Sequence, residues 1–127
     1  MSSYEVNKVN VGIFPAGEAN LGRYRAVRVV AEMLEKPAAG GQCFGICQAD
    51  INLDGEVVAV QVSGIGEIEC AASIATGALV TVDTDGKASA AATTDQYILG
   101  KILQVGAAGK IVPIQLILDQ QVNGPNP

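Results

Sequence analysis

The chain has no histidine, the side chain most often used for acid–base catalysis near neutral pH and for binding metals. Serines such as Ser63 and Ser73 therefore have no imidazole partner to activate them as nucleophiles. Aromatic residues make up only 4% of the chain, which argues against a lined cavity for a small molecule. These absences favour a structural or binding protein over an enzyme.

Basic residues are also few, since eight Lys and Arg stand against 13 Asp and Glu, for a net charge of -5. That charge argues against nucleic-acid binding, which needs clustered Lys and Arg. The densest basic cluster, Arg23, Arg25 and Arg28, alternates as on a strand and is interpreted as solvent-facing or interfacial. The longest apolar stretch, 102–118, is broken by Lys110 and two glycines and is too short to span a membrane. A soluble protein with no nucleic-acid or membrane partner is expected.

Cysteines number three, and no secretory signal flanks them, so Cys43, Cys47 and Cys70 are expected to be buried free thiols in a reducing compartment. The first two would share a strand face, but no histidine or second cysteine pair completes a zinc site. Segment 50–55 alternates oxygen-bearing side chains like the first half of a calcium loop. Gln61 stands where the bidentate Glu belongs, which favours a polar turn. No metal or cofactor is expected.

Two further patterns imitate a catalytic or cofactor site. The sequence Gly64-Ile-Gly66 lacks the third glycine and the following helix of a dinucleotide-binding turn. Glu67 and Glu69 share a strand face, as a catalytic carboxylate pair would, but such spacing is typical of a solvated face. No catalytic residue is predicted.

The clearest pattern present is an internal repeat. Segment 55–62 (GEVVAVQV) returns at 109–116 as GKIVPIQL, with the branched aliphatic residues and the Gln in the same places. The preceding segments 44–48 and 99–104 also match, and 24–29 corresponds loosely to 79–83. A repeat of this kind predicts a duplicated β scaffold in which both copies occupy related positions.

Alternating apolar residues and turn signals predict a mainly β fold, a small compact β-barrel or β-sandwich-like body built from two related units. The expected strands are 24–30, 42–48, 56–63, 64–70, 79–83, 97–104 and 110–119, with a hairpin at 83–86 and a loop or irregular strand at 88–94. Both faces of 56–63 are largely apolar, so that strand is expected to be covered on both sides. Pro113 favours an edge or bulge position.

The expected organisation has three parts. Residues 1–22 form an extended N-terminal arm and 120–127 a C-terminal tail. Between them, 23–119 forms one β-rich domain with repeat units at about 23–64 and 77–118.

Three segments carry a resemblance to a known family: IATGALVTVDTDG at 74–86, YILGKIL at 97–103 and AAGKIVPIQL at 107–116. Their order resembles that of the capsid cement, or head decoration, proteins of tailed bacteriophages. The first half is similar to the same family through Gly17-Glu-Ala19, Phe44-Gly45 and Val60-x-Val62-x-Gly64, so the similarity covers roughly residues 16–118.

The resemblance implies a β-rich structural protein that binds the outer surface of an assembled head and bridges neighbouring capsomers. It implies the major capsid protein as partner, a homo-oligomer with a trimer favoured over a dimer, and a virion component assembled in the host cytoplasm. No family motif supplies a catalytic residue. A phage tail or baseplate adaptor is one alternative, and a small-molecule-binding β domain is another.

The arm supplies the candidate capsid-binding residues, because it offers apolar side chains that no obvious core requires. They are Tyr4, Val6, Val9, Val11, Ile13 and Phe14. An arm can add a strand to an exposed sheet edge on a partner. The alternative, left open, is that these side chains pack onto their own domain.

Overall fold

The structure, a computed structural model, describes residues 9–18, 21–50, 55–91 and 96–121. These residues form ten β-strands: β1 (Val9–Val11), β2 (Ala26–Val30), β3 (Met33–Glu35), β4 (Gly45–Cys47), β5 (Val60–Ser63), β6 (Ile65–Glu69), β7 (Leu79–Val82), β8 (Ala88–Ala90), β9 (Tyr97–Ile102) and β10 (Ile111–Gln121). Within this part of the chain there is no helix that could span a membrane.

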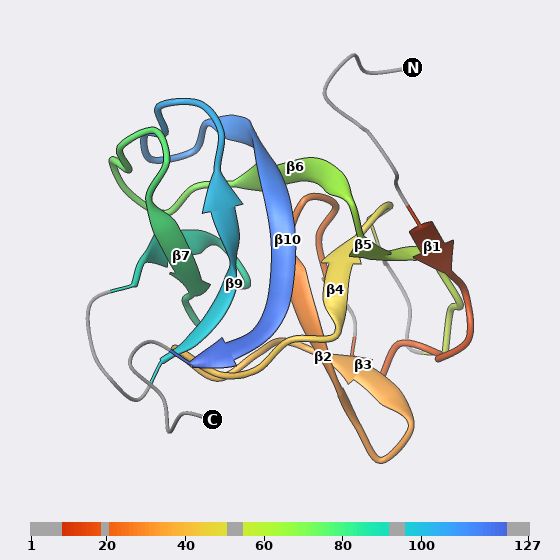
Figure 1. The fold of residues 1–127 in the computed structure, drawn as a ribbon. Coiled ribbons are helices and arrows are strands. Elements are labelled where there is room, and N and C mark those ends of the chain that lie inside the picture. The colour runs from red at the N-terminus through yellow and green to blue at the C-terminus, as the bar shows by residue number, and fades with distance from the viewer. Residues whose placement is uncertain (1–8, 19–20, 51–54, 92–95, 122–127) are drawn as a thin grey trace.

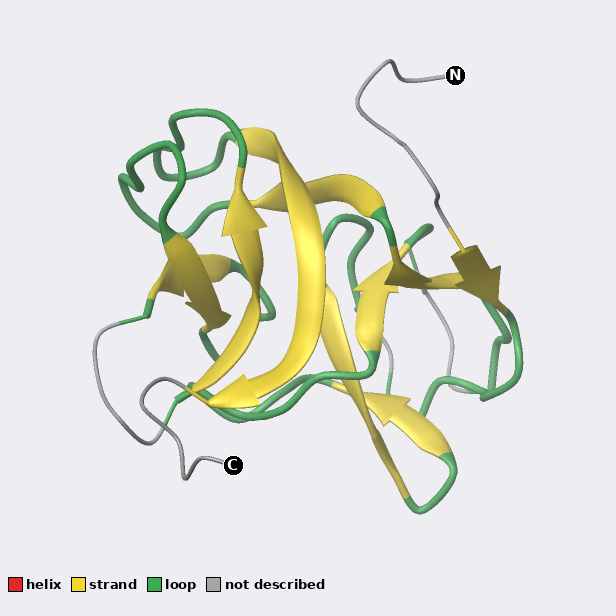
Figure 2. Ribbon diagram, viewed as in Figure 1, coloured by secondary structure: helices red, strands yellow, loops and turns green. Residues whose placement is uncertain are grey.

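The strands form two five-stranded antiparallel sheets, and the predicted mainly β fold of two related units is confirmed (Figures 1 and 2). The first sheet has the order β1-β5-β4-β2-β3 and the second β6-β10-β9-β7-β8. Each strand of the second sheet thus takes the place of the strand five positions earlier in the chain. We call β1–β5 unit 1 and β6–β10 unit 2. The two sheets pack into one compact body and do not close into a barrel.

The pairing register follows the sequence repeat. In unit 1, Gln61 of β5 lies opposite Ile46 of β4. In unit 2, its counterpart Gln115 of β10 lies opposite Lys101 of β9. The comparison of the two repeat copies in the sequence matches the same residues. The structure adds to each unit a first strand, β1 or β6, that this comparison does not include. The exact extents of the arm, the units and the tail stay predictions.

Loop hydrogen bonds repeat as well. The N–H of Tyr24 donates to the carbonyl of Cys47 at 3.0 Å, and the N–H of Gly77 donates to the carbonyl of Ile102 at 2.8 Å. Both donors have positive φ, 67° at Tyr24 and 85° at Gly77. This region strongly favours glycine. The backbone of Tyr24 is therefore strained, since the repeated turn requires a positive φ at this position in both units.

The buried residues form two cores. The first, the unit 1 core, lies on one face of the first sheet and consists of Ala16, Leu21, Val27, Leu34, Cys47 and Val60. The second, the central core, is built mainly by the side of the second sheet that faces the first sheet, with residues such as Ile68, Val80 and Val112. We call this side the inner face of unit 2. Ala26 and Ile46 enter the central core from the opposite face of the first sheet. We call this the outer face of unit 1, and unit 2 covers it.

Backbone contacts hold this joint together. The N–H of Ala26 donates to the carbonyl of Gly86 at 2.8 Å, and the N–H of Glu69 donates to the carbonyl of Tyr24 at 2.9 Å. Gly86, in the β7–β8 turn, lies so close to Ala26 that a Cβ at this position would collide with the Ala26 backbone. The units are therefore in direct main-chain contact, and side-chain packing alone does not set their separation.

The structure corrects several expectations about strands. The strand predicted at 56–63 is shorter, Val60–Ser63, and Val57 is 57% exposed although Gln61 is fully buried. Cys43 precedes β4 and packs in the central core while Cys47 packs in the unit 1 core, so the shared-face expectation was wrong. Of the proposed calcium-like segment, 51–54 lies outside the described residues.

Pro113 also differs from its predicted edge or bulge position. It lies in β10, between β6 and β9, while the irregularity in the β10–β9 pairing falls between Leu116 and Gln120. Its carbonyl accepts a hydrogen bond from the N–H of Leu103, one residue beyond the end of β9. The nitrogen and the carbonyl of a strand residue point to the same side, so the nitrogen of Pro113 also faces the segment just after β9. The N–H that proline lacks is therefore missing at a place where the pairing with β9 has already ended. The central strand thus tolerates the proline.

Replacing Gly86 by alanine tests the joint against a matched control. Gly109 has the same φ of +80° but open space around its Cα. Gly109→Ala should lower the free energy of unfolding by about 1–2 kcal/mol, the cost of positive φ. Gly86→Ala should lower it by a further 1–3 kcal/mol, roughly the cost of overpacking. Urea denaturation measures both, and equal losses would show that the close approach to Ala26 contributes nothing.

Candidate functional site

The predicted capsid-binding residues have different environments. Tyr4 and Val6 lie outside the described residues. Val9 in β1 and Ile13 just after it are 48% and 65% exposed. Val11 is half-buried in β1, opposite Val60. Surface contact is thus open to Val9, on an edge strand of the first sheet, and to Ile13, two residues beyond the end of that strand.

Phe14 belongs to the packing of unit 1. Its ring lies edge-on to that of Phe44, with 5.5 Å between centroids and an interplanar angle of 77°. Both rings pack against the unit 1 core. Phe14 therefore packs onto its own domain, which is the alternative that the sequence left open.

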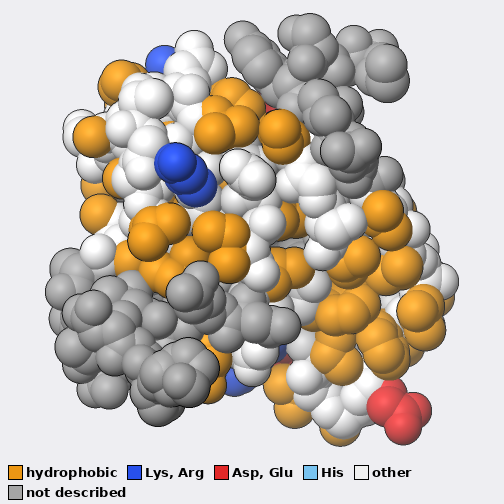
Figure 3. Space-filling view, in the orientation of Figure 1, with side chains coloured by type: hydrophobic (Ala, Val, Ile, Leu, Met, Phe, Trp, Pro, Cys, Tyr) orange, Lys and Arg blue, Asp and Glu red, His pale blue; other side chains and the backbone are white. Residues whose placement is uncertain are grey.

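The two rings belong to a half-exposed apolar surface. We call it the inner face of unit 1, and its members pack against the unit 1 core without being fully buried: Phe14, Val29, Phe44, Val58 and Val62. Figure 3 shows apolar side chains gathered over the region of β3, β4 and β5. Sequence reasoning missed this surface, because alternation gives a strand's apolar face without showing whether anything covers it.

A second apolar surface covers the outward side of the second sheet. We call it the outer face of unit 2. Its exposed residues are Leu79, Leu103, Ile111 and Ile117, with Lys101 and Gln115 among them. Figure 3 shows apolar side chains around a basic one over β9 and β10. Large exposed apolar surfaces of this kind mark interaction sites.

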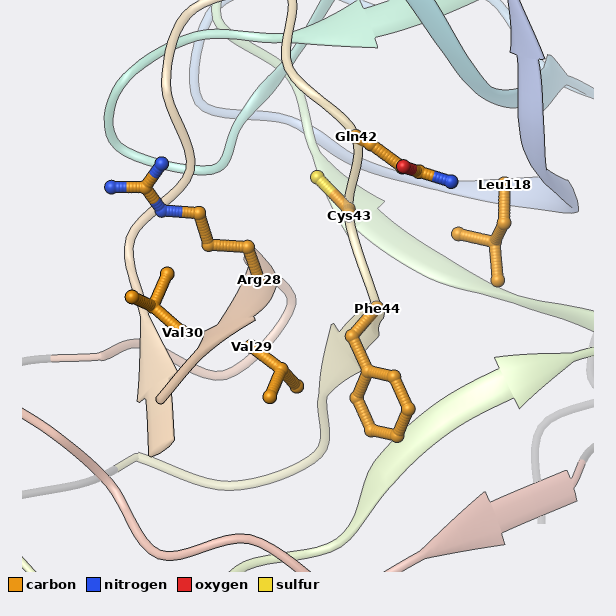
Figure 4. Close-up of a pocket in the computed structure, with 7 residues that line it drawn as sticks. All are labelled: Arg28, Val29, Val30, Gln42, Cys43, Phe44 and Leu118. Carbon is orange, nitrogen blue, oxygen red and sulfur yellow. The ribbon is translucent and has the colours of Figure 1, made fainter. Parts of the chain in front are cut away.

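A cleft of about 530 Å³ lies between β2, the segment before β4 and the end of β10. Its lining residues are Arg28, Val29, Val30, Gln42, Cys43, Phe44 and Leu118 (Figure 4). The guanidinium of Arg28 lies 3.7 Å from the carboxylate of Glu35, which supplies its countercharge. The walls combine three aliphatic side chains and one aromatic ring with the polar side chains of Arg28 and Gln42. Small-molecule sites are usually lined predominantly by hydrophobic and aromatic side chains, which this mixed lining does not match.

The basic cluster serves ion pairs and stacking. Arg25 pairs with Glu69 at 3.0 Å, and Lys87 lies 3.7 Å from the same carboxylate. Arg23 lies over the ring of Tyr24, 4.6 Å from its centroid. The pair of Arg25 and Glu69 joins unit 1 to unit 2, so Glu69 has a structural role where the sequence suggested a solvated face.

The three cysteines are free, buried thiols, as the sequence predicted. Burial raises the pKa of Cys43 to about 12 and that of Cys47 to about 11, and it raises the pKa of Cys70. Thiols held protonated in this way are poor nucleophiles and poor metal ligands. Within the described ranges, no three Cys, Asp or Glu side chains gather as a metal site would require.

The sequence matches a model of one protein family, described as phage cement protein, over residues 9–116. The chain belongs to the phage cement protein family. The predicted resemblance to capsid cement proteins is therefore confirmed, and the match begins at residue 9, before the start expected at about residue 16. No curated protein sequence matches the chain.

A solved structure shares the fold of this family member. It is the crystal structure of the N base of head fiber gp8.5 from bacteriophage phi29, with a TM-score of 0.69 and 16% sequence identity. The match covers 91% of this chain and 98% of that chain. At this identity the likeness establishes the fold alone.

The raised thiol pKa values predict how stability depends on pH. Unfolded cysteines ionise near their ordinary value of 9.0, whereas Cys47 stays protonated to about 11 in the folded chain. Raising the pH from 9 to 11 therefore favours the unfolded state, by up to about 1.4 kcal/mol per pH unit for this thiol. Denaturation should show a steeper loss for the wild type than for Cys47→Ala. Parallel pH profiles would contradict the buried thiol.

Proposed function

We propose that this protein is a capsid cement protein that binds the outer surface of an assembled phage head and bridges neighbouring capsomers. Its partner is the major capsid protein, and it joins the virion in the host cytoplasm. The family match over residues 9–116 is the observation that carries this proposal. The likeness to a phage head fiber base supports a place on the head.

The exposed apolar surfaces support a binding role. Val9 and Ile13 stand at one edge of the first sheet, where β1 has no strand beyond it among the described residues. An edge strand can pair with a strand of a partner while neighbouring side chains enter pockets. We therefore keep the region before Phe14 as the candidate capsid contact, with Val9 and Ile13 as its exposed members and Val11 as a half-buried one.

A structural role in the virion, without catalysis, agrees with the ion pairs and buried thiols described above. The strength of such a protein comes from many contacts. A standard interface buries about 800 Å² on each partner. Several modest contacts made at once by linked copies give a durable attachment through effective concentration. Bridging of capsomers would use this effect.

The tail or baseplate adaptor is the second candidate function, and copy number in purified particles separates the two. A cement protein is present in many copies over the head surface, whereas an adaptor is present in the few copies that tail symmetry allows. Quantitative mass spectrometry of intact particles measures this number directly. A few copies per particle would favour the adaptor.

Particles that lack the protein should assemble with normal geometry but rupture at a lower temperature. A ligand that binds only the assembled shell stabilises it by mass action. Adding the purified protein back should restore the rupture temperature, as measured by thermal release of DNA. Misassembled heads in its absence would contradict a role limited to finished shells.

Substitutions at the edge of the first sheet test the candidate contact. Ile13→Asp should weaken binding to shells by at least tenfold, because it places a charge in an apolar contact. The melting temperature of the free protein should change little, since Ile13 is 65% exposed. Val105→Asp is a matched control at an exposed valine in unit 2. Equal binding by the wild type and Ile13→Asp in a shell pull-down would place the contact elsewhere.

A further inference from the structure

The two units are equivalent in topology, but their outer faces have different environments. On the outer face of unit 1, Ala26, Ile46 and Gln61 are at most 1% exposed. The residues at the same register positions in unit 2 are Leu79, Lys101 and Gln115, and all three are exposed. Unit 2 packs on the outer face of unit 1 and so covers the first three residues. Their counterparts in unit 2 stay exposed, although Thr81 and Pro113 on the same face of the second sheet are buried.

The inner faces show the complementary difference. In unit 1 the five residues of the inner face are half-buried. Their counterparts in unit 2 are Ile68, Val82, Leu99, Val112 and Leu116, and the first four are at most 2% exposed. The outer face of unit 1 covers them. The outer face of unit 1 and the inner face of unit 2 thus cover each other. The inner face of unit 1 and the outer face of unit 2 are the two surfaces that remain exposed or half-exposed.

This pattern fixes the kind of contact between the units. A twofold relation would bury the same face of both units, because both would use one self-complementary surface. Here the outer face of one unit meets the inner face of the other. Such a heterologous contact leaves one unused surface of each kind at the two ends of the pair.

We propose that copies of this chain associate head to tail, with the inner face of unit 1 in one copy packed on the outer face of unit 2 in the next. The contact repeats between chains the packing that already joins the two units within one chain. This inference goes beyond the proposed capsid binding and does not depend on it.

The two hairpins give the contact a specific geometry. Within the chain, the β7–β8 turn lies on the backbone of Ala26 through Gly86. Its counterpart is the β2–β3 hairpin, which projects from the body in Figure 1. The two residues of its turn, Ala31 and Glu32, are exposed. In the proposed contact this turn lies over Leu79 of the next copy, as the β7–β8 turn lies over Ala26.

Charge supports the same arrangement. Lys101 lies directly opposite Leu79 in the second sheet and is exposed, where unit 1 has the buried Ile46. A lysine at this place needs a carboxylate from whatever covers it. The turn that would lie over Leu79 carries the exposed carboxylate of Glu32. Among the described residues neither charge has an ion-pair partner.

A head-to-tail contact repeated from copy to copy closes into a ring if its rotation divides a full turn, and otherwise builds a filament. The trimer that the family resemblance implies would be such a ring of three copies. The interface between copies would then bury both apolar surfaces and leave the region of Val9 and Ile13 for another partner.

Sedimentation velocity of the purified full chain over a range of concentrations tests the proposal. The wild type should associate as its concentration rises. Leu79→Asp disables the outer face, and Val62→Asp disables the inner face, so each variant should sediment as a monomer. An equal mixture should give a dimer and nothing larger, because one intact face of each kind remains. Val57→Asp, at another exposed valine, is the control and should associate like the wild type.

A charge exchange keeps the test independent of folding, since both residues are exposed. Glu32→Lys and Lys101→Glu should each weaken association by roughly tenfold, and the double variant should regain most of it. A wild type that stays monomeric at all concentrations would overturn the proposal. So would a mixture of Leu79→Asp and Val62→Asp that forms no dimer while both remain folded by circular dichroism, or a double charge variant no stronger than the singles.

Discussion

The main-chain contact between the two units is the constraint on which the rest of the structure depends. Gly86 lies against the backbone of Ala26, and this close approach lets the first sheet cover the open side of the central core. Without it, residues such as Ile68 and Val112 would have no cover, because the second sheet supplies only one side of that core. A chain with few aromatic residues has small side chains with which to fill gaps, so a short separation between layers matters more here than in a Phe-rich protein.

Duplication explains why such a chain has uncovered apolar surfaces at all. Each unit has an inner face that needs a cover and an outer face that can provide one, as in stacked repeat proteins. Solenoids end their stacks with capping repeats that carry a polar outer face. The described residues form two units, and neither end of the pair is fully polar: Phe44 and Val62 remain half-exposed at one end and Leu79 is exposed at the other. The proposed attachment to other surfaces would use apolar ends of this kind.

Much of this fold could be predicted from the sequence, since a repeat in sequence is a repeat in register. The match of Gln61 with Gln115 located β5 and β10, and the Gly at 45 and 100 located their neighbours. Burial could not be predicted in the same way. Val57 looked like part of a covered strand and is exposed, while Phe14 looked free and packs on Phe44. Alternation reports only that a face is apolar, whereas its cover comes from segments distant in the chain. The candidate site depends on cover, and so it was predicted less well than the strands.

The two glutamines show most directly how position in the stack decides what a residue does. Gln61 is fully buried, and its side-chain amide donates to the carbonyl of Ser63 at 3.0 Å, beside Gly66, where a Cβ would collide with the same amide. Gln115 occupies the equivalent register position in its own sheet, opposite Lys101, yet it is exposed. Burying a polar amide is unfavourable unless it is hydrogen-bonded. Gln61 meets that condition in part through the tight connection into unit 2, and the described residues after Gln115 make no such connection. The same side chain therefore secures the joint in one unit and remains available to a partner in the other.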